Sequence, residues 1–205
     1  MEINLFFQIA VIIVSIVFHE LSHGYAAYFL GDSTAKYEGR LTINPLKHLE
    51  VFGSIIVPLL THALSGMVFG WAKPVPYNPY NLKIPRWGEV IVAAAGPLAN
   101  LSIALIFSLY VRSLGAGIAD SPTGDLALLI IIINLTLAIF NLIPIPPLDG
   151  FKIFWGILPY RLHHIRDFFQ KHMLLFIIIF LFGFSFILNP IVTWLFQLFT
   201  GISLR

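Results

Sequence analysis

The chain of 205 residues contains no cysteine and few charged residues. Without cysteine there can be no disulfide bond, no thiolate catalysis and no cysteine metal ligand, so a metal ion would have to bind to His, Asp or Glu. Charged residues make up 11% of the sequence, whereas an ordinary soluble domain has about 25%. The net charge of +2 is too small and too dispersed to indicate nucleic-acid binding. These shortages exclude a soluble domain and a nucleic-acid partner.

Hydrophobic residues, by contrast, make up 58% of the sequence, and the mean hydropathy is +0.88. At about 20 apolar residues per crossing, the length allows about four to six membrane-spanning helices and leaves no room for a receptor or sensor domain. We therefore expect an all-α, polytopic protein of the cell membrane, with a single transmembrane domain over residues 1–205. Its immediate partner is the lipid bilayer, and the sequence does not indicate an oligomeric state.

Four apolar runs are long enough to cross a membrane: 3–30, 88–111, 126–143 and 173–188. The first run would be about 42 Å long as a helix. It lacks the positively charged start of a signal peptide, so we expect it to be retained. The last run ends at Asn189-Pro190, and residues 191–199 form a short apolar C-terminal helix that is too short to cross again.

Segment 52–70 has spanning length but contains several residues that interrupt helices. The distribution of basic residues decides between two topologies. If the segment is re-entrant, ten of the twelve Lys and Arg residues lie on one side of the membrane; if it crosses, the division is about seven to five. We therefore predict a re-entrant segment, with residues 31–87 and 150–172 on the cytoplasmic side.

The first run contains the sequence His-Glu-Leu-Ser-His at positions 19 to 23. On a helix, the spacing of four residues places His19 and His23 on one face, one turn apart, as two zinc ligands with the Glu20 carboxylate beside them. Ionisable residues within a membrane span are costly and are functional by default. The alternative is a pair of histidines that form hydrogen bonds with neighbouring helices.

A catalytic zinc ion needs a third protein ligand and an open position for water. Asp149 stands apart from the other candidates, because Pro144 ends the preceding helix and the segment must return through protein at membrane depth. With 52–70 re-entrant, Asp149 and His23 lie on the same side. The alternative for Asp149 is a turn before Gly150. The other candidates are Asp32, Glu38, Glu50, Glu89, His163, His164 and His172.

Two motifs resemble those of the site-2 proteases, which are intramembrane zinc metalloproteases. The first is FHELSHG at residues 18–24, and the second is NLIPIPPLDG at residues 141–150. The resemblance covers nearly the whole chain and is greatest to compact prokaryotic members without PDZ or CBS domains. One departure is Phe151, where many members have a second glycine. We expect it to alter local packing and to leave metal ligation intact.

The resemblance implies one zinc ion per chain, bound by His19, His23 and Asp149. Glu20 would act as the general base and then protonate the leaving amine. Asn141 is similar to the asparagine that the family places near the scissile carbonyl, where its amide could stabilise the oxyanion. The alternative for Asn141 is a cap on the helix terminus, and for Asn100 we expect a hydrogen bond between helices.

The implied substrate is a transmembrane helix of another membrane protein. His19 would lie about 16 Å from the helix end at Leu30, on the cytoplasmic side. Residues 36–43 alternate weakly and are predicted to form a hairpin, which together with 71–81 could bind an extended substrate as an added strand. Alternatively, 71–81 belongs to an interfacial aromatic belt made of Trp71, Tyr77, Tyr80 and Trp87.

Two other functions compete with this interpretation. The first is a non-enzymatic membrane protein, either a catalytically inactive zinc-binding protein or a transporter. Transporters usually contain paired broken helices from internal repeats, which the sequence does not have. The second is a zinc protease that acts at the membrane surface, but its His-Glu-x-x-His motif would lie outside the apolar span.

Overall fold

The computed structural model describes residues 5–50, 53, 56, 59–60, 72–115 and 121–203, and within them it contains no β-strand. The predicted all-α fold is confirmed. The α-helices are α1 (Leu5–Phe29), α2 (Thr34–Tyr37), α4 (Pro85–Leu114), α5 (Pro122–Asn141), α6 (Asp149–Ile157), α7 (His163–Lys171) and α8 (Met173–Thr200). Short 3-10 helices are η1 (Pro45–Lys47), η3 (Pro79–Asn81) and η5 (Tyr160–Leu162).

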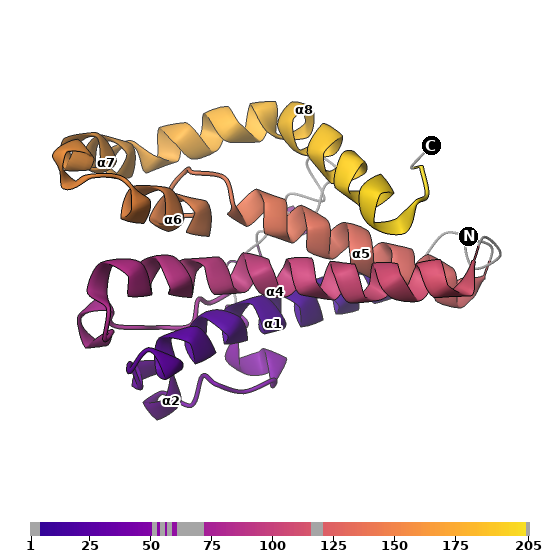
Figure 1. Ribbon diagram of the computed structural model, residues 1–205, viewed down its shortest axis with the longest axis horizontal. Helices are drawn as coiled ribbons and strands as arrows, with labels where there is room; N and C mark the ends of the chain where they lie inside the picture. Colours follow the sequence, from indigo (N-terminus) through magenta and orange to yellow (C-terminus); the bar gives the residue numbers. More distant parts are fainter. Residues whose placement is uncertain are drawn as a thin grey trace.

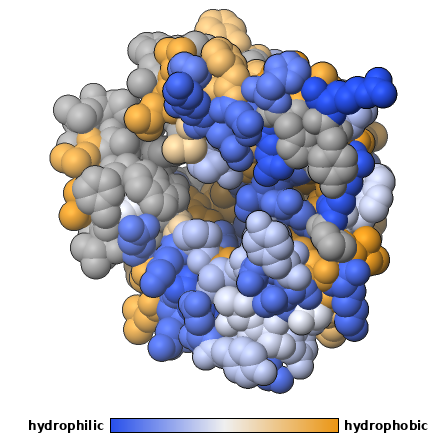
Figure 2. Space-filling model, turned by 90° about the vertical axis from the view of Figure 1, so that its left-hand side faces the viewer, coloured by the Kyte–Doolittle hydropathy of each residue, from blue (hydrophilic) through white to orange (hydrophobic). Residues whose placement is uncertain are grey.

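Three of the described helices, α1, α4 and α5, are long and apolar enough to cross a membrane. Helix α4 packs against both of the others and runs in the opposite direction to them (Figure 1). The end of α1, the start of α4 and the end of α5 therefore meet at one end of the bundle, together with α6 and α7. Hydrophilic residues cover this end of the molecule (Figure 2), which we call the polar end.

The predicted re-entrant segment 52–70 lies almost wholly outside the described residues. The chain on either side of it is described, and the backbone N–H of Lys83 donates to the carbonyl of Leu30 over 2.9 Å. The chain thus returns, before α4 begins, to the same end at which α1 finishes. A re-entrant segment requires this return, and its path stays a prediction.

Helix α8 is longer than the sequence analysis predicted. The expected stop at Asn189-Pro190 is wrong, because α8 continues through Pro190 to Thr200 and includes the predicted separate helix 191–199. A proline inside a helix costs about 3 kcal/mol, but Val192 and Phe196 are buried in a core with residues of α4 and α5, which offsets that cost. Figure 1 shows that α8 changes direction part-way along. The predicted span 173–188 lies within α8, and its crossing stays a prediction.

The predicted hairpin at 36–43 is wrong. Asp32 Oδ1 accepts hydrogen bonds from the backbone N–H and the hydroxyl of Thr34, which fixes the start of α2. Gly39, with a φ of 62°, ends the following turn. These local turn contacts favour the helical turn over the strand that the weak alternation of the segment predicted. Residues 72–78 are irregular, as their prolines predict.

The sequence analysis did not predict helices α6 and α7, which lie in the loop 150–172. Phe151 and Trp155 on α6 are buried, with ring centroids 5.9 Å apart, so the departure at Phe151 fills space beside α4. Arg86, in the first turn of α4, fixes the other end of α6. Its guanidinium donates to the carbonyls of Gly156 over 2.6 Å, of Ile157 over 2.8 Å and of Leu158 over 2.7 Å.

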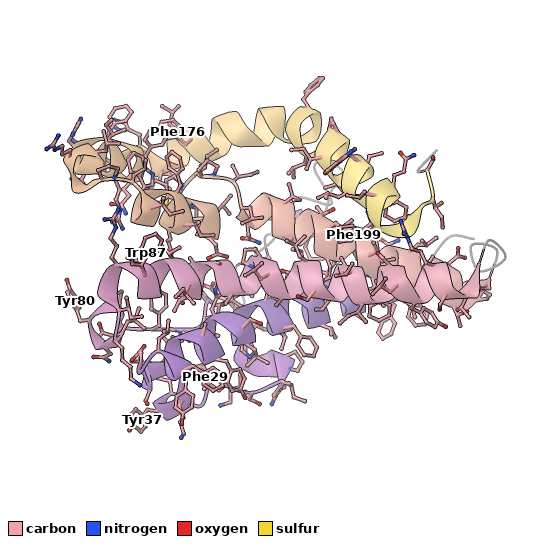
Figure 3. The ribbon with its side chains drawn as sticks, in the orientation of Figure 1. Phe29, Tyr37, Tyr80, Trp87, Phe176 and Phe199 are labelled. Atoms are coloured by element: carbon pink, nitrogen blue, oxygen red, sulfur yellow. The ribbon has the colours of Figure 1, made fainter. Side chains whose placement is uncertain are left out.

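Two of the four aromatic residues of the predicted interfacial belt are exposed, and their place at a membrane interface stays a prediction. Tyr80 and Trp87 are exposed at the polar end, and Tyr37 lies there with them (Figure 3). Tyr77 differs from the prediction because it is only partly exposed, with Lys152 Nζ 5.2 Å from its ring centroid. Trp71 lies outside the described residues.

Candidate metal centre

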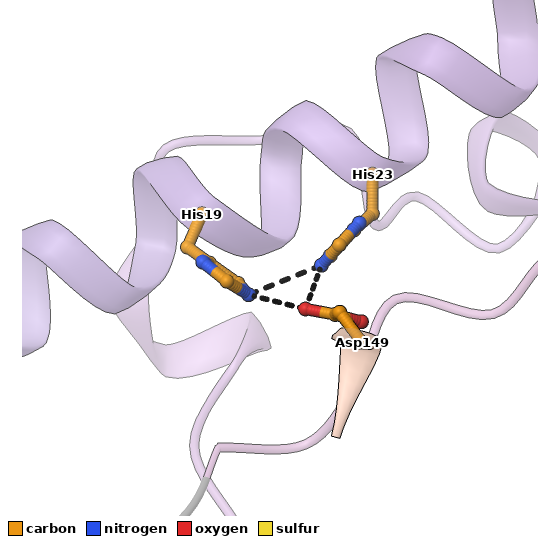
Figure 4. A group of neighbouring side chains, drawn as sticks. All are labelled: His19, His23 and Asp149. Carbon is orange, nitrogen blue, oxygen red and sulfur yellow. Dashed lines mark hydrogen bonds and ion pairs between the residues drawn. The ribbon is translucent and has the colours of Figure 1, made fainter. Parts of the chain in front are cut away.

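His19 and His23 lie one turn apart on α1, as their spacing predicts, and both are buried. Their Nε2 atoms are 3.1 Å apart. The rings meet edge to face, with centroids 4.7 Å apart. Both Nε2 atoms point away from α1 towards the start of α6 (Figure 4).

Asp149 reaches this pair from the first turn of α6. Its Oδ2 atom is 3.1 Å from each Nε2 atom, across 130 and 126 residues of sequence. The close approach depends on Gly150, because a Cβ atom at that position would overlap the carbonyl oxygen atoms of Leu142 and Ile143. The return of the chain after α5 thus places the carboxylate opposite the histidines (Figure 4).

The outer nitrogen of each imidazole is held by an oxygen acceptor. His23 Nδ1 donates to the carbonyl of Val92 over 2.6 Å. His19 Nδ1 lies 2.6 Å from Asn100 Oδ1. The Asn100 amide nitrogen donates to the Ser15 carbonyl, which fixes the orientation of the amide, so His19 must be the donor in its bond to Asn100. Both rings therefore present an Nε2 lone pair to Asp149, the arrangement in which histidine binds metals.

Two lone pairs and a carboxylate oxygen 3.1 Å apart repel one another unless a cation lies between them. Zinc bound tetrahedrally at about 2.0–2.1 Å holds its ligand atoms about 3.3 Å apart. The observed spacing agrees with this geometry, and two imidazoles with a carboxylate suit zinc. Within the described residues this is the only group of three His, Asp or Glu side chains that could hold a metal ion.

Gly96 on α4 forms the wall behind the two histidines. A Cβ atom there would lie 2.6 Å from His19 Nε2 and would also overlap His23 Nε2. Distances below 3.0 Å are essentially never found for a real Cβ atom. The missing side chain thus leaves the space in which the two ligand atoms lie.

Glu20 is next to the group but is not part of it. It is partly exposed, and its Oε2 atom accepts a hydrogen bond from the backbone N–H of Val75 over 2.8 Å. The second carboxylate oxygen can accept a proton. Glu20, the general base suggested by the sequence, is therefore held in place by a backbone N–H of the irregular segment that precedes η3.

Asn141 does not join the metal group. It is the last residue of α5, and its amide nitrogen donates to the carbonyl of Leu137 one turn earlier over 2.9 Å. The asparagine that contacts a proposed ligand is Asn100, for which only a bond between helices was expected. It forms that bond as well, by donating to Asn134 Oδ1 over 2.8 Å.

The sequence analysis missed two members of this polar network, Ser15 and Asn134. Both are buried within helices of spanning length, and the amide of Asn134 donates to the hydroxyl of Ser15 over 2.9 Å. Asn134 interrupts an apolar run, which was a usable signal because a polar side chain in a span needs a partner. The backbone contributions of Val75 and Val92 have no sequence signal.

Asp32, the first of the other candidate ligands, has a structural role. It is buried, and its oxygen atoms accept hydrogen bonds from the Asn81 amide over 2.8 Å and from the Asn78 backbone over 2.7 Å, in addition to those from Thr34. Burial by itself raises the pKa of Asp32, but these donors outweigh burial and lower the pKa below its usual value. Asp32 therefore joins the end of α1 to the segment before α4.

A family model described as "Peptidase family M50" matches residues 7–126 and 116–184. The chain belongs to this family. Membership confirms the predicted enzyme class, a membrane metalloprotease, and zinc as the implied metal. No solved structure matches this M50 peptidase.

Curated relatives of the M50 peptidase carry corresponding names. "Putative zinc metalloprotease YwhC" of Bacillus subtilis is 43% identical over 159 residues, which cover 75% of this chain and 69% of the relative. "Putative zinc metalloprotease Rip2" of Mycolicibacterium smegmatis is 32% identical over 139 residues, covering 68% and 52%. "Zinc metalloprotease MJ0392" of Methanocaldococcus jannaschii is 26% identical over 154 residues, covering 75% and 35%. The match thus spans about half of Rip2 and a third of MJ0392.

Proposed function

We propose that this M50 peptidase is an intramembrane zinc endopeptidase that cleaves transmembrane segments of membrane proteins. His19, His23 and Asp149 would hold one zinc ion per chain. The observation that carries the proposal is the 3.1 Å convergence of their three ligand atoms inside an apolar, span-length helix bundle. Burying a carboxylate and two imidazoles within a membrane span is costly, so their presence there indicates a functional site.

When bound there, zinc would supply Lewis acidity, which lowers the pKa of a water molecule towards neutrality and polarises a carbonyl group. Glu20 takes a proton from the attacking water through its free carboxylate oxygen. The water oxygen forms a bond to the scissile carbonyl carbon, and the C–N bond then breaks. Glu20 delivers the proton to the leaving amine, so one water molecule is consumed for each peptide bond.

Asn141 is proposed as a donor to the oxyanion. Its amide nitrogen carries two hydrogens, and one of them is used in the bond to Leu137. No acceptor for the second hydrogen is found among the described residues, and we propose that it donates to a substrate oxygen at the end of α5. Asn141→Ala would then lower kcat with little effect on zinc content, whereas a purely capping residue would affect stability instead.

We propose that the active site faces the cytoplasm and belongs to a single domain over residues 1–205. The support is the hydrophilic surface of the polar end (Figure 2), together with the excess of basic residues that the sequence places in 31–87 and 150–172. A substrate would enter laterally from the bilayer. Because the proposed zinc ligands lie within the helix bundle, the enzyme would cut a membrane-embedded segment in preference to the same sequence presented as a soluble peptide.

The test uses the full chain, purified and reconstituted into liposomes with a transmembrane reporter substrate. Glu20→Gln should retain zinc and lose cleavage. Asp149→Ala and His23→Ala should lose or weaken zinc as well as cleavage. Zinc is measured by elemental analysis, and thermal unfolding checks the fold of each variant.

Each alternative outcome removes a specific part of the proposal. Zinc content that Asp149→Ala leaves unchanged removes Asp149 as a ligand. Cleavage by Glu20→Gln removes Glu20 as the base. A zinc-loaded wild-type protein that cleaves no membrane substrate indicates the inactive zinc-binding alternative, and preferential cleavage of soluble peptides indicates a surface protease.

A further inference from the structure

Residues 72–78 form an irregular segment beside α1 that we call the strap. Neighbouring parts of the chain hold it at both ends. The backbone N–H of Lys73 donates to the carbonyl of His48 over 2.8 Å. At the other end, the N–H of Asn78 donates to Asp32 Oδ2 over 2.7 Å. The strap is thus fixed by groups that contact neither the proposed zinc ligands nor Glu20.

One peptide group of the strap, the bond from Pro74 to Val75, is held on both of its sides. Its carbonyl oxygen accepts a hydrogen bond from Arg40 Nη2 over 3.2 Å. Its N–H, on Val75, donates to Glu20 Oε2 over 2.8 Å. Because a trans peptide group is planar, with C=O and N–H pointing in opposite directions, a group that fixes the oxygen also fixes the direction of the N–H.

Arg40 forms two hydrogen bonds with the backbone of the strap. Its guanidinium also donates to the carbonyl of Lys73 over 2.8 Å, and the residue is only 6% exposed. Among the described residues the structure records no ion pair for it. A buried guanidinium with carbonyl acceptors alone polarises the peptide group that it binds and strengthens the donor on the far side of that group. That donor is the Val75 N–H, which faces the Glu20 carboxylate.

The position of Arg40 is itself set by a short local structure. Its backbone N–H donates to the carbonyl of Ala35 over 2.9 Å, directly after the left-handed turn at Gly39. Ala35 is buried, so this turn is packed against the rest of the polar end. The turn after α2 therefore presents the guanidinium to the strap.

We propose that Arg40 is a positioning residue for Glu20, and that it acts through the peptide group between Pro74 and Val75. This inference rests on the proposed function, in which Glu20 is the general base. A glutamate side chain has several rotamers, and a partly exposed one is not confined by packing. The Val75 N–H holds one carboxylate oxygen, and the other, which has no partner among the described residues, is left for the attacking water. Arg40 fixes the direction of that N–H by binding the carbonyl oxygen of the same peptide group.

The first experiment compares Arg40→Gln with the matched control Arg112→Gln in the reconstituted enzyme. Arg112 also donates to a backbone carbonyl, that of Leu198 over 2.6 Å, but at the opposite end of α4. We expect Arg40→Gln to lower kcat per bound zinc by about 10- to 100-fold without a change in KM or in zinc content, because misplacing a reacting group has effects of this size. Arg112→Gln should keep the wild-type kcat per zinc. A wild-type kcat in Arg40→Gln, or a loss explained wholly by lost zinc, overturns the inference.

The second experiment tests the route through the peptide group. Replacing Val75 by its α-hydroxy acid turns the amide into an ester, which removes the N–H and keeps the side chain. If Arg40 acts through this N–H, the ester alone lowers kcat by a similar factor, and Arg40→Gln causes no further loss in the ester background. Independent effects that multiply in the double variant refute the route.

Failure of this inference is distinguishable from failure of the proposed function. Cleavage by Glu20→Gln refutes the proposed function, whatever the Arg40 variants do. Loss of cleavage in Glu20→Gln, combined with normal turnover in Arg40→Gln and in the ester, keeps the proposed function and refutes only the positioning role.

Discussion

Replacing Gly96 by alanine should damage the proposed zinc site while leaving the helix intact. A Cβ atom at this position would lie 2.6 Å from His19 Nε2 and 2.7 Å from His19 Cε1, whereas ordinary van der Waals contact begins at 3.4 Å. The imidazole must therefore move by about 0.8 Å, the difference between these distances, while zinc–ligand distances tolerate only about 0.2 Å. We expect zinc affinity to fall by about 100-fold.

The fold should survive this substitution, because alanine is better than glycine in a helix by about 1 kcal/mol. The measurement is a competition titration of zinc against a chelator, combined with the thermal unfolding of the metal-free protein. Gly88→Ala, in the same helix, is the control. The three atoms nearest to its Cβ atom would all belong to the Leu82 side chain, from 3.1 Å outwards, so the clash is smaller and falls on no proposed zinc ligand. Zinc affinity equal to wild type in Gly96→Ala would refute the argument that this wall defines the site.

Three further predictions concern residues around the site. Asn100→Ala removes the acceptor that orients His19 and should weaken zinc binding by about 10- to 100-fold in the same titration; an unchanged affinity would mean that the ring is held otherwise. Arg86→Gln removes the donors that close α6 and should weaken zinc binding by about 10-fold, because Asp149 is then less well fixed; normal affinity with normal stability would refute this. Asp32 has a lowered pKa, so its stabilisation is present above the ordinary pKa of about 3.9 and is lost as the pH falls below it. Asp32→Asn should therefore cost about 2 kcal/mol at neutral pH and progressively less as the pH falls from the ordinary pKa through the lowered one, which thermal unfolding over a pH series would detect.

The spans and two of the three proposed ligands follow directly from sequence periodicity. An apolar run of spanning length has few alternatives, and a spacing of four residues on a helix fixes which side chains share a face. Asp149 could be predicted because Pro144 ends a helix where a buried carboxylate must find a partner. These inferences need only local geometry and the cost of burying charge.

The remainder depends on how the helices are rotated against one another, which the sequence does not encode locally. Asn100 and Asn134 meet because the face of α4 that carries Asn100 packs against the face of α5 that carries Asn134. From the sequence alone, either residue could have bonded elsewhere. Pro190 indicated a helix end, but the burial of Phe196 outweighed it. The link between Val75 and Glu20 involves a backbone amide, which has no residue preference to reveal it.

The distances along the chain between the polar partners of α1 have a consequence for biosynthesis. The acceptors for the outer nitrogens of His23 and His19 lie 69 and 81 residues further on, and Asp149 lies 130 residues after His19. At a synthesis rate of about 5–20 residues per second, α1 waits about 7–26 s for that carboxylate. Until α4 supplies the two acceptors, the imidazoles can pair only with water, lipid headgroups or the insertion machinery; after that, their Nε2 atoms still wait for Asp149. The order of synthesis thus means that the metal centre cannot be completed before the start of α6 has been made.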